Sequence, residues 1–211
     1  MQARMNHPAM VVPDAMKVLQ SLGDVTKKGL PEKLLELVHL RASQINGCSV
    51  CVDMHPKIAK KVGEKLKARK ETVGVSESSA GGLISAVLLA VPGASAYFMG
   101  GAVVYTRPAG EAFLTATPSK RAGIRSSSEP WATLAAELVR ERLGTTWGLA
   151  ETGASGPTGN SYGDPAGHTC VAVVGPKGKT ARTLRTDSND RVANMRAFAA
   201  EALKLLDEQL T

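Results

Sequence analysis

Two adjacent serines, Ser78 and Ser79, stand between an apolar run and a pair of glycines in "VGVSESSAGGLISAVLLAV". We expect a strand before them and a helix after them, so that Ser78 lies in the connecting turn. Unpaired N–H groups and the macrodipole at a helix N-terminus favour negative charge, which would help a serine nucleophile, an oxyanion or a bound phosphate. The alternative interpretation is that one of the serines only caps the helix.

A second glycine-rich stretch, "TGASGPTGN" at 152–160, follows another expected strand. Two such loops at strand ends, in a sheet covered by helices, are expected to meet at one cleft. Gly81 and Gly82 would let a ligand approach the backbone closely, because glycine has no side chain. The sequence therefore predicts a small-molecule site formed by the two loops.

A different chemistry is possible near the start of the chain, where Cys48 and Cys51 form a C-x-x-C pair followed by His55. At the start of a helix, the dipole and the neighbouring sulfur lower the pKa of the first thiol, which favours redox chemistry. Zinc needs four ligands and is disfavoured, because only Glu36 and two histidines lie nearby. Two structural cysteines are the other alternative. Cys170 stands in an apolar run and is expected to be a small buried hydrophobe.

The elements that must position these residues change in character after residue 55. Residues 1–55 are expected to be helical, and a lysine-rich helix follows as far as Lys70. Beyond it we expect strands at 72–76, 96–106, 146–151, 169–175 and 180–186, and helices at 79–91, 130–144 and 189–209. This order predicts an α/β fold, a three-layer α/β sandwich with a mixed sheet that ends in a hairpin, preceded by a short all-α segment.

The net charge of +7 first suggests a nucleic-acid partner. The excess lies wholly in residues 1–70, much of it in "KIAKKVGEKLKARK", where Ile58, Val62 and Leu66 are spaced four apart. The lysines are then the solvated face of an amphipathic helix, and nucleic-acid binding is not expected. The longest apolar stretch, 83–91, is half a membrane span, and no secretory leader is recognisable, so we expect a cytoplasmic protein without a membrane partner.

The motifs "ESSAGGLISA", "VPGASAYFMGGAVVYT", "TGASGP" and "PAGHT" resemble the CinA C-terminal domain of the competence/damage-inducible family, over residues 56–211. The resemblance implies a nicotinamide-nucleotide amidohydrolase that converts nicotinamide mononucleotide (NMN) to nicotinate mononucleotide and ammonia. It matches the family's nucleophile to Ser78 and its active-site tyrosine to Tyr105, and we expect no cofactor and no metal. The substrate-binding residues that follow are Gly81, Gly82, Thr152, Gly153, Ser155, Gly156 and Arg191, the last well placed to hold a phosphate.

One position departs from the family's pattern. Its amidohydrolases carry a lysine five residues after the tyrosine, acting as the base, and this sequence has Gly110 there. A serine hydroxyl needs a nearby base to become nucleophilic, and the other polar candidates are Glu77, Arg107, Lys120 and His168. Two functions therefore stay open, a pyridine-nucleotide amidohydrolase and a nucleotide-binding or assembly module without catalysis.

The first 55 residues resemble part of the alkyl hydroperoxidase D/carboxymuconolactone decarboxylase family. Its E-x(11)-C-x-x-C-x-x-x-H constellation is matched at Glu36, Cys48, Cys51 and His55, which implies a thiol peroxidase or disulfide reductase. The family's later helices are missing, because the chain passes at Pro56 into the CinA-like part. We therefore expect two domains, 1–55 and 56–211. We also expect a homo-oligomer, since a fragment of this size buries little core alone.

Overall fold

The computed structural model of the chain describes Ser21 and residues 57–211. Its elements in chain order are α5 (Lys57–Arg69), β1 (Val73–Glu77), α6 (Leu83–Leu89), the 3-10 turn η1 (Ala94–Ala96), β2 (Phe98–Val103), α7 (Arg107–Leu114), α8 (Glu129–Leu143), β3 (Trp147–Ala154), β4 (His168–Gly175), β5 (Gly178–Arg185) and α9 (Arg191–Gln209). The predicted all-α segment, with Glu36, Cys48, Cys51 and His55, lies outside the described residues.

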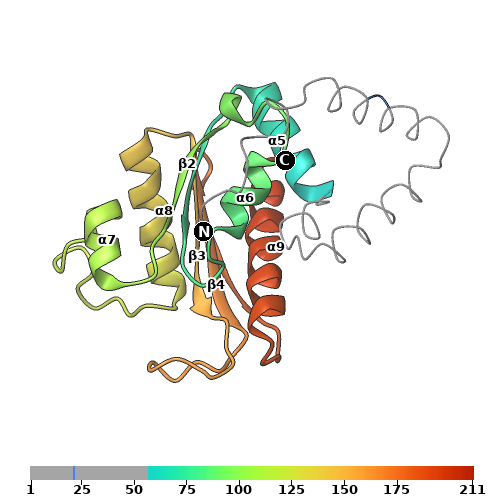
Figure 1. Cartoon of the computed structure of the whole chain (residues 1–211). Coiled ribbons are helices and arrows are strands. Elements are labelled where there is room, and N and C mark those ends of the chain that lie inside the picture. Colours follow the sequence, from blue (N-terminus) through green and yellow to red (C-terminus); the bar gives the residue numbers. More distant parts are fainter. Residues whose placement is uncertain (1–20, 22–56) are drawn as a thin grey trace, which may run out of the picture. The chain divides into compact units, whose positions relative to one another are not determined.

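The five strands form one mixed sheet in the order β2-β1-β3-β4-β5. Strand β1 is parallel to both β2 and β3, whereas β4 runs antiparallel to β3 and forms the predicted hairpin with β5. Helices α7 and α8 cover one face of the sheet, and α5, α6 and α9 cover the other (Figure 1). The predicted three-layer α/β architecture is confirmed. The carboxyl ends of the three parallel strands lie at one edge of the sheet.

Strand β3 lies in the middle of the sheet and supplies side chains to both cores. Trp147 and Leu149 join the core beneath α5, α6 and α9, whereas Ala150 joins the core beneath α8, as the two-residue period of a strand requires. Helix α8 packs directly on the backbone of this strand. A Cβ atom on Gly148 would lie only 2.0 Å from the carbonyl oxygen of Ala136, so glycine is required at this close approach.

Helix α5 has the amphipathic pattern expected from its spacing. Val62 and Leu66 are fully buried, and Ile58 packs against the same core. On the other face, Lys61 and Lys65 form ion pairs with Asp207 at 2.8 and 2.7 Å. No helix in the described part of the chain is long and apolar enough to cross a membrane.

Two expectations about helices between 79 and 129 were wrong. Helix α6 begins at Leu83 instead of Ser79, because Gly81 and Gly82 adopt left-handed φ angles of 69° and 98°. Helix α7 was not predicted, since Pro108 and Gly110 both disfavour a helix interior. It forms because the hydroxyl of Thr106 accepts a hydrogen bond from the N–H of Ala109, with proline in the first turn, where it is tolerated.

Candidate functional site

The turn after β1 is held at its first residue by Glu77. One carboxylate oxygen accepts hydrogen bonds from two backbone N–H groups, including that of Gly82, and the other accepts the N–H and hydroxyl of Ser85, all at 2.6–2.9 Å. This carboxylate therefore satisfies the N-terminus of α6, whose N-cap residue makes no side-chain hydrogen bond of its own. Neither Ser78 nor Ser79 caps this helix, so the capping interpretation was wrong.

A second carboxylate, that of Glu151 on β3, holds the two serines themselves. One oxygen accepts the N–H groups of Ser78 and Ala80 at 3.0 and 2.8 Å. The other accepts the hydroxyls of Ser79 and of Thr169 on β4, the latter at 3.0 Å. Burial raises the pKa of Glu151, although these four hydrogen bonds act in the opposite direction. The serine turn is thereby fastened to the two central strands.

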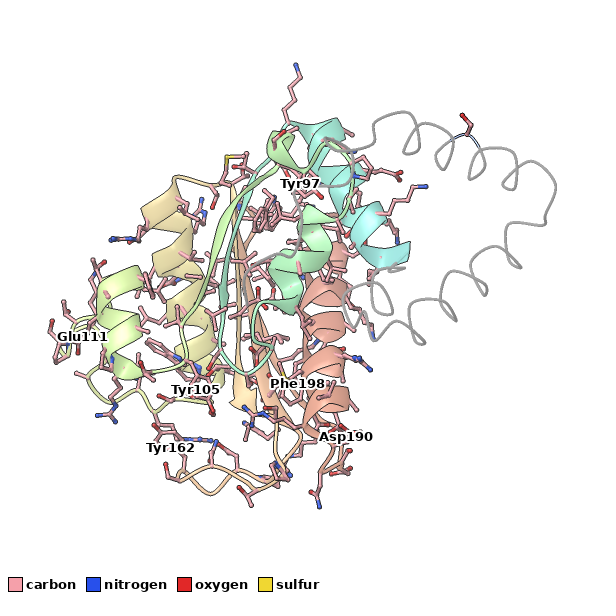
Figure 2. The ribbon with its side chains drawn as sticks, viewed as in Figure 1. Tyr97, Tyr105, Glu111, Tyr162, Asp190 and Phe198 are labelled. Carbon is pink, nitrogen blue, oxygen red and sulfur yellow. The ribbon has the colours of Figure 1, made fainter. Side chains whose placement is uncertain are left out.

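Ser78 borders a cavity of about 290 Å³ at the carboxyl edge of the sheet. Its Oγ atom makes no hydrogen bond to any residue that the structure describes, whereas the Ser79 hydroxyl is committed to Glu151. Figure 2 shows Tyr105 and Tyr162 together at this end of the sheet. The cavity is lined by side chains of four segments that meet here: Ser78, Val104, Tyr105, Thr106, Arg107, Arg121, Ser126, Ser127, Trp131, Thr152, Gly153, Asn160 and Tyr162.

Of the residues predicted from sequence, the fold gathers Ser78, Tyr105, Thr152 and Gly153 around the cavity. The serine turn meets the start of the second glycine-rich stretch because β1 and β3 are adjacent parallel strands whose carboxyl ends coincide. Thr152 and Gly153 lie within β3, which extends to Ala154 and does not end at residue 151 as expected. The sequence did not reveal Arg121, Ser126, Trp131, Asn160 or Tyr162. These residues come from irregular segments and a helix start, and no periodic spacing relates them to Ser78.

The N–H groups expected to hold an oxyanion have other partners. The N–H of Gly81 donates to the carbonyl of Ser78 at 3.2 Å, and that of Gly82 donates to Glu77. Neither glycine borders the cavity. Within residues 57–211, the N–H of Ser79 has no hydrogen-bond acceptor. It is an unoccupied donor directly after Ser78, although Ser79, like the two glycines, is not among the residues that line the cavity.

The remaining predicted binding residues, Ser155, Gly156 and Arg191, do not line the cavity beside Ser78. A guanidinium nitrogen of Arg191 donates to the carbonyl of Gly156 at 2.6 Å. The Ser155 hydroxyl is buried without a partner among the described residues, and its carbonyl accepts from Asn194 at 2.8 Å. These contacts tie the loop to the start of α9, which is a structural task.

None of the proposed replacement bases except Arg107 reaches the cavity. Glu77 is used at the start of α6, and Lys120 is exposed. His168 is buried, with Nε2 3.0 Å from the carbonyl of Ser127. An arginine is not a practical base, because its guanidinium stays protonated. The cavity therefore offers tyrosine hydroxyls as its titratable groups, besides arginines.

Tyr162 carries one of these hydroxyls. A hydrogen bond with Ser126 lowers its pKa, and so do the hydrogen bond and charge of Arg107, while burial acts in the opposite direction. The net effect places the pKa of Tyr162 below its ordinary value, because nearby cations stabilise the phenolate.

Position 110, where the family's lysine is missing, is buried on α7. A Cβ atom there would meet ordinary contacts only, 3.6 Å from a guanidinium nitrogen of Arg121 and 3.7 Å from Val104. The space beside position 110 thus contains the side chain of Arg121, which reaches it from the segment after α7. The cation next to this position is therefore the guanidinium of Arg121, which does not release its proton.

Cys170 is buried, as expected, and burial raises the pKa of its thiol. Its sulfur lies 3.4 Å from the Thr183 hydroxyl and 3.6 Å from His168 Nε2. No group of three His, Cys, Asp or Glu side chains within the described ranges is arranged to hold a metal ion.

Comparison with known proteins identifies the family. The family model of the CinA C-terminal domain matches residues 55–210. This chain belongs to the CinA C-terminal domain family. The model of the carboxymuconolactone decarboxylase family also matches, over residues 13–91, so the two matches overlap across α5, β1 and α6.

Curated CinA relatives are longer than the part of them that this chain matches. A CinA-like protein of Desulfosudis oleivorans is 35% identical over 164 residues, which is 78% of this chain and 40% of the relative. One of Myxococcus xanthus is 34% identical over 195 residues, 91% of this chain and 46% of the relative. This chain therefore spans less than half the length of these CinA-like proteins.

Solved CinA structures have the same fold. A competence or damage-inducible protein from Enterobacter asburiae superimposes with a TM-score of 0.69 at 25% identity, over 74% of this chain and 97% of that one.

The Glu151 contacts predict which substitutions the fold tolerates. Glu151→Gln should cost less than about 1 kcal/mol, because the amide oxygen can accept both N–H groups and its NH2 can donate to the two hydroxyls. Glu151→Ala leaves both N–H groups unpaired and should cost about 2–5 kcal/mol. Urea denaturation monitored by circular dichroism measures both.

The same pair of proteins tests the raised pKa of Glu151. Because the native state holds this proton more tightly than the unfolded state, its stabilising effect is complete at low pH and declines as the pH rises through the native pKa. The stability of the native protein relative to Glu151→Gln should therefore fall as the pH rises above the ordinary pKa range of a glutamate. A difference that does not change with pH would contradict the assignment.

Proposed function

We propose that this chain binds a pyridine mononucleotide such as NMN beside Ser78 and hydrolyses its carboxamide slowly. The observation that carries the proposal is the placement of Ser78. Ser78 borders the cavity, its hydroxyl has no hydrogen-bond partner among the described residues, and its turn donates hydrogen bonds to Glu77 on one side and Glu151 on the other. A nucleophile held in this way loses little freedom on reaction. Membership of the CinA family supports the choice of substrate class.

The proposed reaction uses one serine in two steps. Ser78 Oγ adds to the carboxamide carbon, and the N–H of Ser79 is the candidate donor to the oxyanion that forms. The C–N bond then breaks, and ammonia leaves with the proton of the serine. Water hydrolyses the resulting ester, which yields the carboxylate and restores the Ser78 hydroxyl.

Slow turnover follows from the groups that line the cavity. Position 110 carries no lysine, and the tyrosines must act in place of a stronger base. Tyr162 is the candidate proton acceptor, since its pKa is lowered, and Tyr105 borders the same space. A tyrosine is mostly protonated at neutral pH, so the rate should rise with pH. If the rate of hydrolysis falls to zero, the chain is a module that only binds the nucleotide.

A second function is supported by the carboxymuconolactone decarboxylase match, which covers residues 13–91. That range includes Glu36, Cys48, Cys51 and His55. We propose that the cysteine pair is redox-active and cycles between dithiol and disulfide, with the glutamate and histidine relaying protons. Efficient peroxide turnover is not expected, because the match ends at residue 91 and its last part overlaps the CinA domain. Self-association of this segment stays a prediction.

The first test compares the two serines. Ser78→Ala should abolish ammonia release from NMN, because it removes the nucleophile, whereas Ser79→Ala should keep at least roughly a tenth of the native rate. The Ser79 variant loses a hydrogen bond to a buried carboxylate, worth about 1.5–3 kcal/mol of stability. Equal loss of activity in both variants would show that the turn is purely structural. Tight NMN binding without any ammonia release would identify a binding module.

The second test restores the missing base. Gly110→Lys should raise the rate of ammonia release at least about tenfold, since a positioned general base contributes 10²–10⁴. The neighbouring Arg121 disfavours a second cation and lowers the pKa of the new amine, which suits it to act as a base. Gly110→Met is the matched control, because it adds a side chain of similar length without an amine. Equal rates in both variants would mean that the cavity has diverged further.

The third test concerns the cysteines. Thiol labelling of the folded protein should modify Cys48 and Cys51 faster than Cys170, whose thiol pKa is raised by burial. Mild oxidation should remove two hydrogens from the mass, and a dithiol should reverse this. His55→Ala should slow peroxide consumption if the histidine relays protons. Rapid catalytic peroxide removal with a lipoyl-type reductant would instead make this segment the main enzyme.

A further inference from the structure

The cavity beside Ser78 carries an unbalanced positive charge. Two arginines border it, Arg107 at the start of α7 and Arg121 in the segment before α8. Among the described residues that line it, none is an aspartate or a glutamate. Two guanidinium groups facing one small space, without a carboxylate there, attract an anion from solution.

Arg121 is fixed in position but keeps donors free. Its guanidinium lies 4.2 Å from the ring centre of the buried Trp131, and one terminal nitrogen donates to the hydroxyl of Ser126 at 3.1 Å. Its Nε and Nη1 atoms donate to no acceptor within residues 57–211. A guanidinium that is stacked and anchored on one side presents the rest of its planar fork at little entropic cost.

The electrostatic balance at Arg121 indicates that its charge is incompletely compensated. Burial lowers the pKa of this guanidinium, and the charge of Arg107 lowers it further, whereas Tyr162 and Glu111 offset only part of the effect. An anion placed between the two arginines would remove this unfavourable repulsion.

Other arginines near the site are already committed. Arg125 forms a bidentate ion pair with Asp164 at 2.6 and 3.0 Å. Arg191, which the sequence suggested for a phosphate, donates to the carbonyl of Gly156 at 2.6 Å and does not border this cavity. The donors that remain available to a ligand are therefore those of Arg121 that Ser126 does not occupy and those of Arg107 beyond its hydrogen bond to Tyr162.

We propose that Arg121 and Arg107 form a receptor for an oxyanion group of the ligand, a phosphate or a carboxylate, and that Arg121 determines the specificity of the cavity for anionic ligands. The identity of the ligand as a pyridine nucleotide rests on the function proposed above, whereas the receptor itself rests on the two arginines. Arg121 reaches the space beside position 110. Its guanidinium can bind an anionic group there, but it cannot transfer a proton. Arginine suits this task, because its fork matches the two oxygens of either group.

Four related ligands distinguish the two sources of the oxyanion without any variant. NMN carries only the phosphate, nicotinate riboside only the carboxylate, nicotinate mononucleotide both, and nicotinamide riboside neither. Calorimetry on the full chain should show that the ligands with the recognised group bind at least about tenfold more tightly than those without it. A difference of this size corresponds to one charge-assisted hydrogen bond. Equal affinities for all four would overturn the proposal.

Variants then assign the effect to Arg121. Arg121→Gln should weaken the preferred anionic ligand by about 10- to 100-fold and leave nicotinamide riboside unchanged. Arg121→Lys should give an intermediate loss, because the charge remains but the fork is lost. Lys120→Gln is the matched control. It removes the same charge one residue away, from an exposed side chain outside the cavity, and should bind like the native protein.

The outcomes separate this receptor from the proposed function. An anion preference that survives Arg121→Gln, or that disappears in Arg191→Ala instead, overturns the receptor and leaves the nucleotide function standing. If none of the four ligands binds, the nucleotide function fails, and the probe becomes inorganic phosphate. Phosphate binding that Arg121→Gln abolishes and Lys120→Gln preserves would still establish the receptor. No phosphate binding by the native chain would overturn it as well.

Discussion

The buried carboxylate of Glu151 is the constraint on which the site depends. It accepts hydrogen bonds from two backbone N–H groups of the serine turn and from the hydroxyls of Ser79 and Thr169. Burying an ionised carboxylate is unfavourable unless its oxygens are fully occupied by donors. The turn depends on the carboxylate in the same way, because the N–H groups of Ser78 and Ala80 have Glu151 as their acceptor. Ser78 is left with its hydroxyl free as a result.

Two acidic residues accept the N–H groups between β1 and α6, where a single N-cap side chain would ordinarily accept them. Glu77 satisfies the first turn of α6, so the serines are released from capping. The left-handed glycines at 81 and 82 separate the turn from the helix and delay its start to Leu83. This arrangement places a serine at the edge of a sheet with one neighbour, Ser79, anchored in the interior. It explains why two adjacent serines have different environments.

Position 110 is where this sequence departs from the amidohydrolase pattern that its motifs resemble. Position 110 has no side chain, yet a guanidinium lies beside it, supplied by Arg121 from outside the helix. Exchanging an amine for a guanidinium preserves charge and removes proton transfer, because arginine does not lose its proton at physiological pH. Fold alone does not decide between catalysis and binding.

The sequence by itself determined the elements with strong local patterns. The spacing of Ile58, Val62 and Leu66 predicted α5, and the alternation of strands and helices predicted the mixed sheet that the structure confirms. It also predicted that the serine turn would meet the stretch that begins at Thr152, whose first residues belong to β3. This is a consequence of adjacent strand ends, and it requires no knowledge of side-chain contacts.

Only the tertiary structure decided what surrounds Ser78. Glu151 lies 71 to 73 residues from the turn that it holds, and nothing in local propensity marks it as a partner. Helix α7 was invisible because proline and glycine disfavour it, and its cap and packing outweigh that preference. The approach of Arg121 to position 110 depends on how an irregular segment folds back over α7. Contacts of this kind come from packing between distant segments, for which residue type and spacing carry no signal.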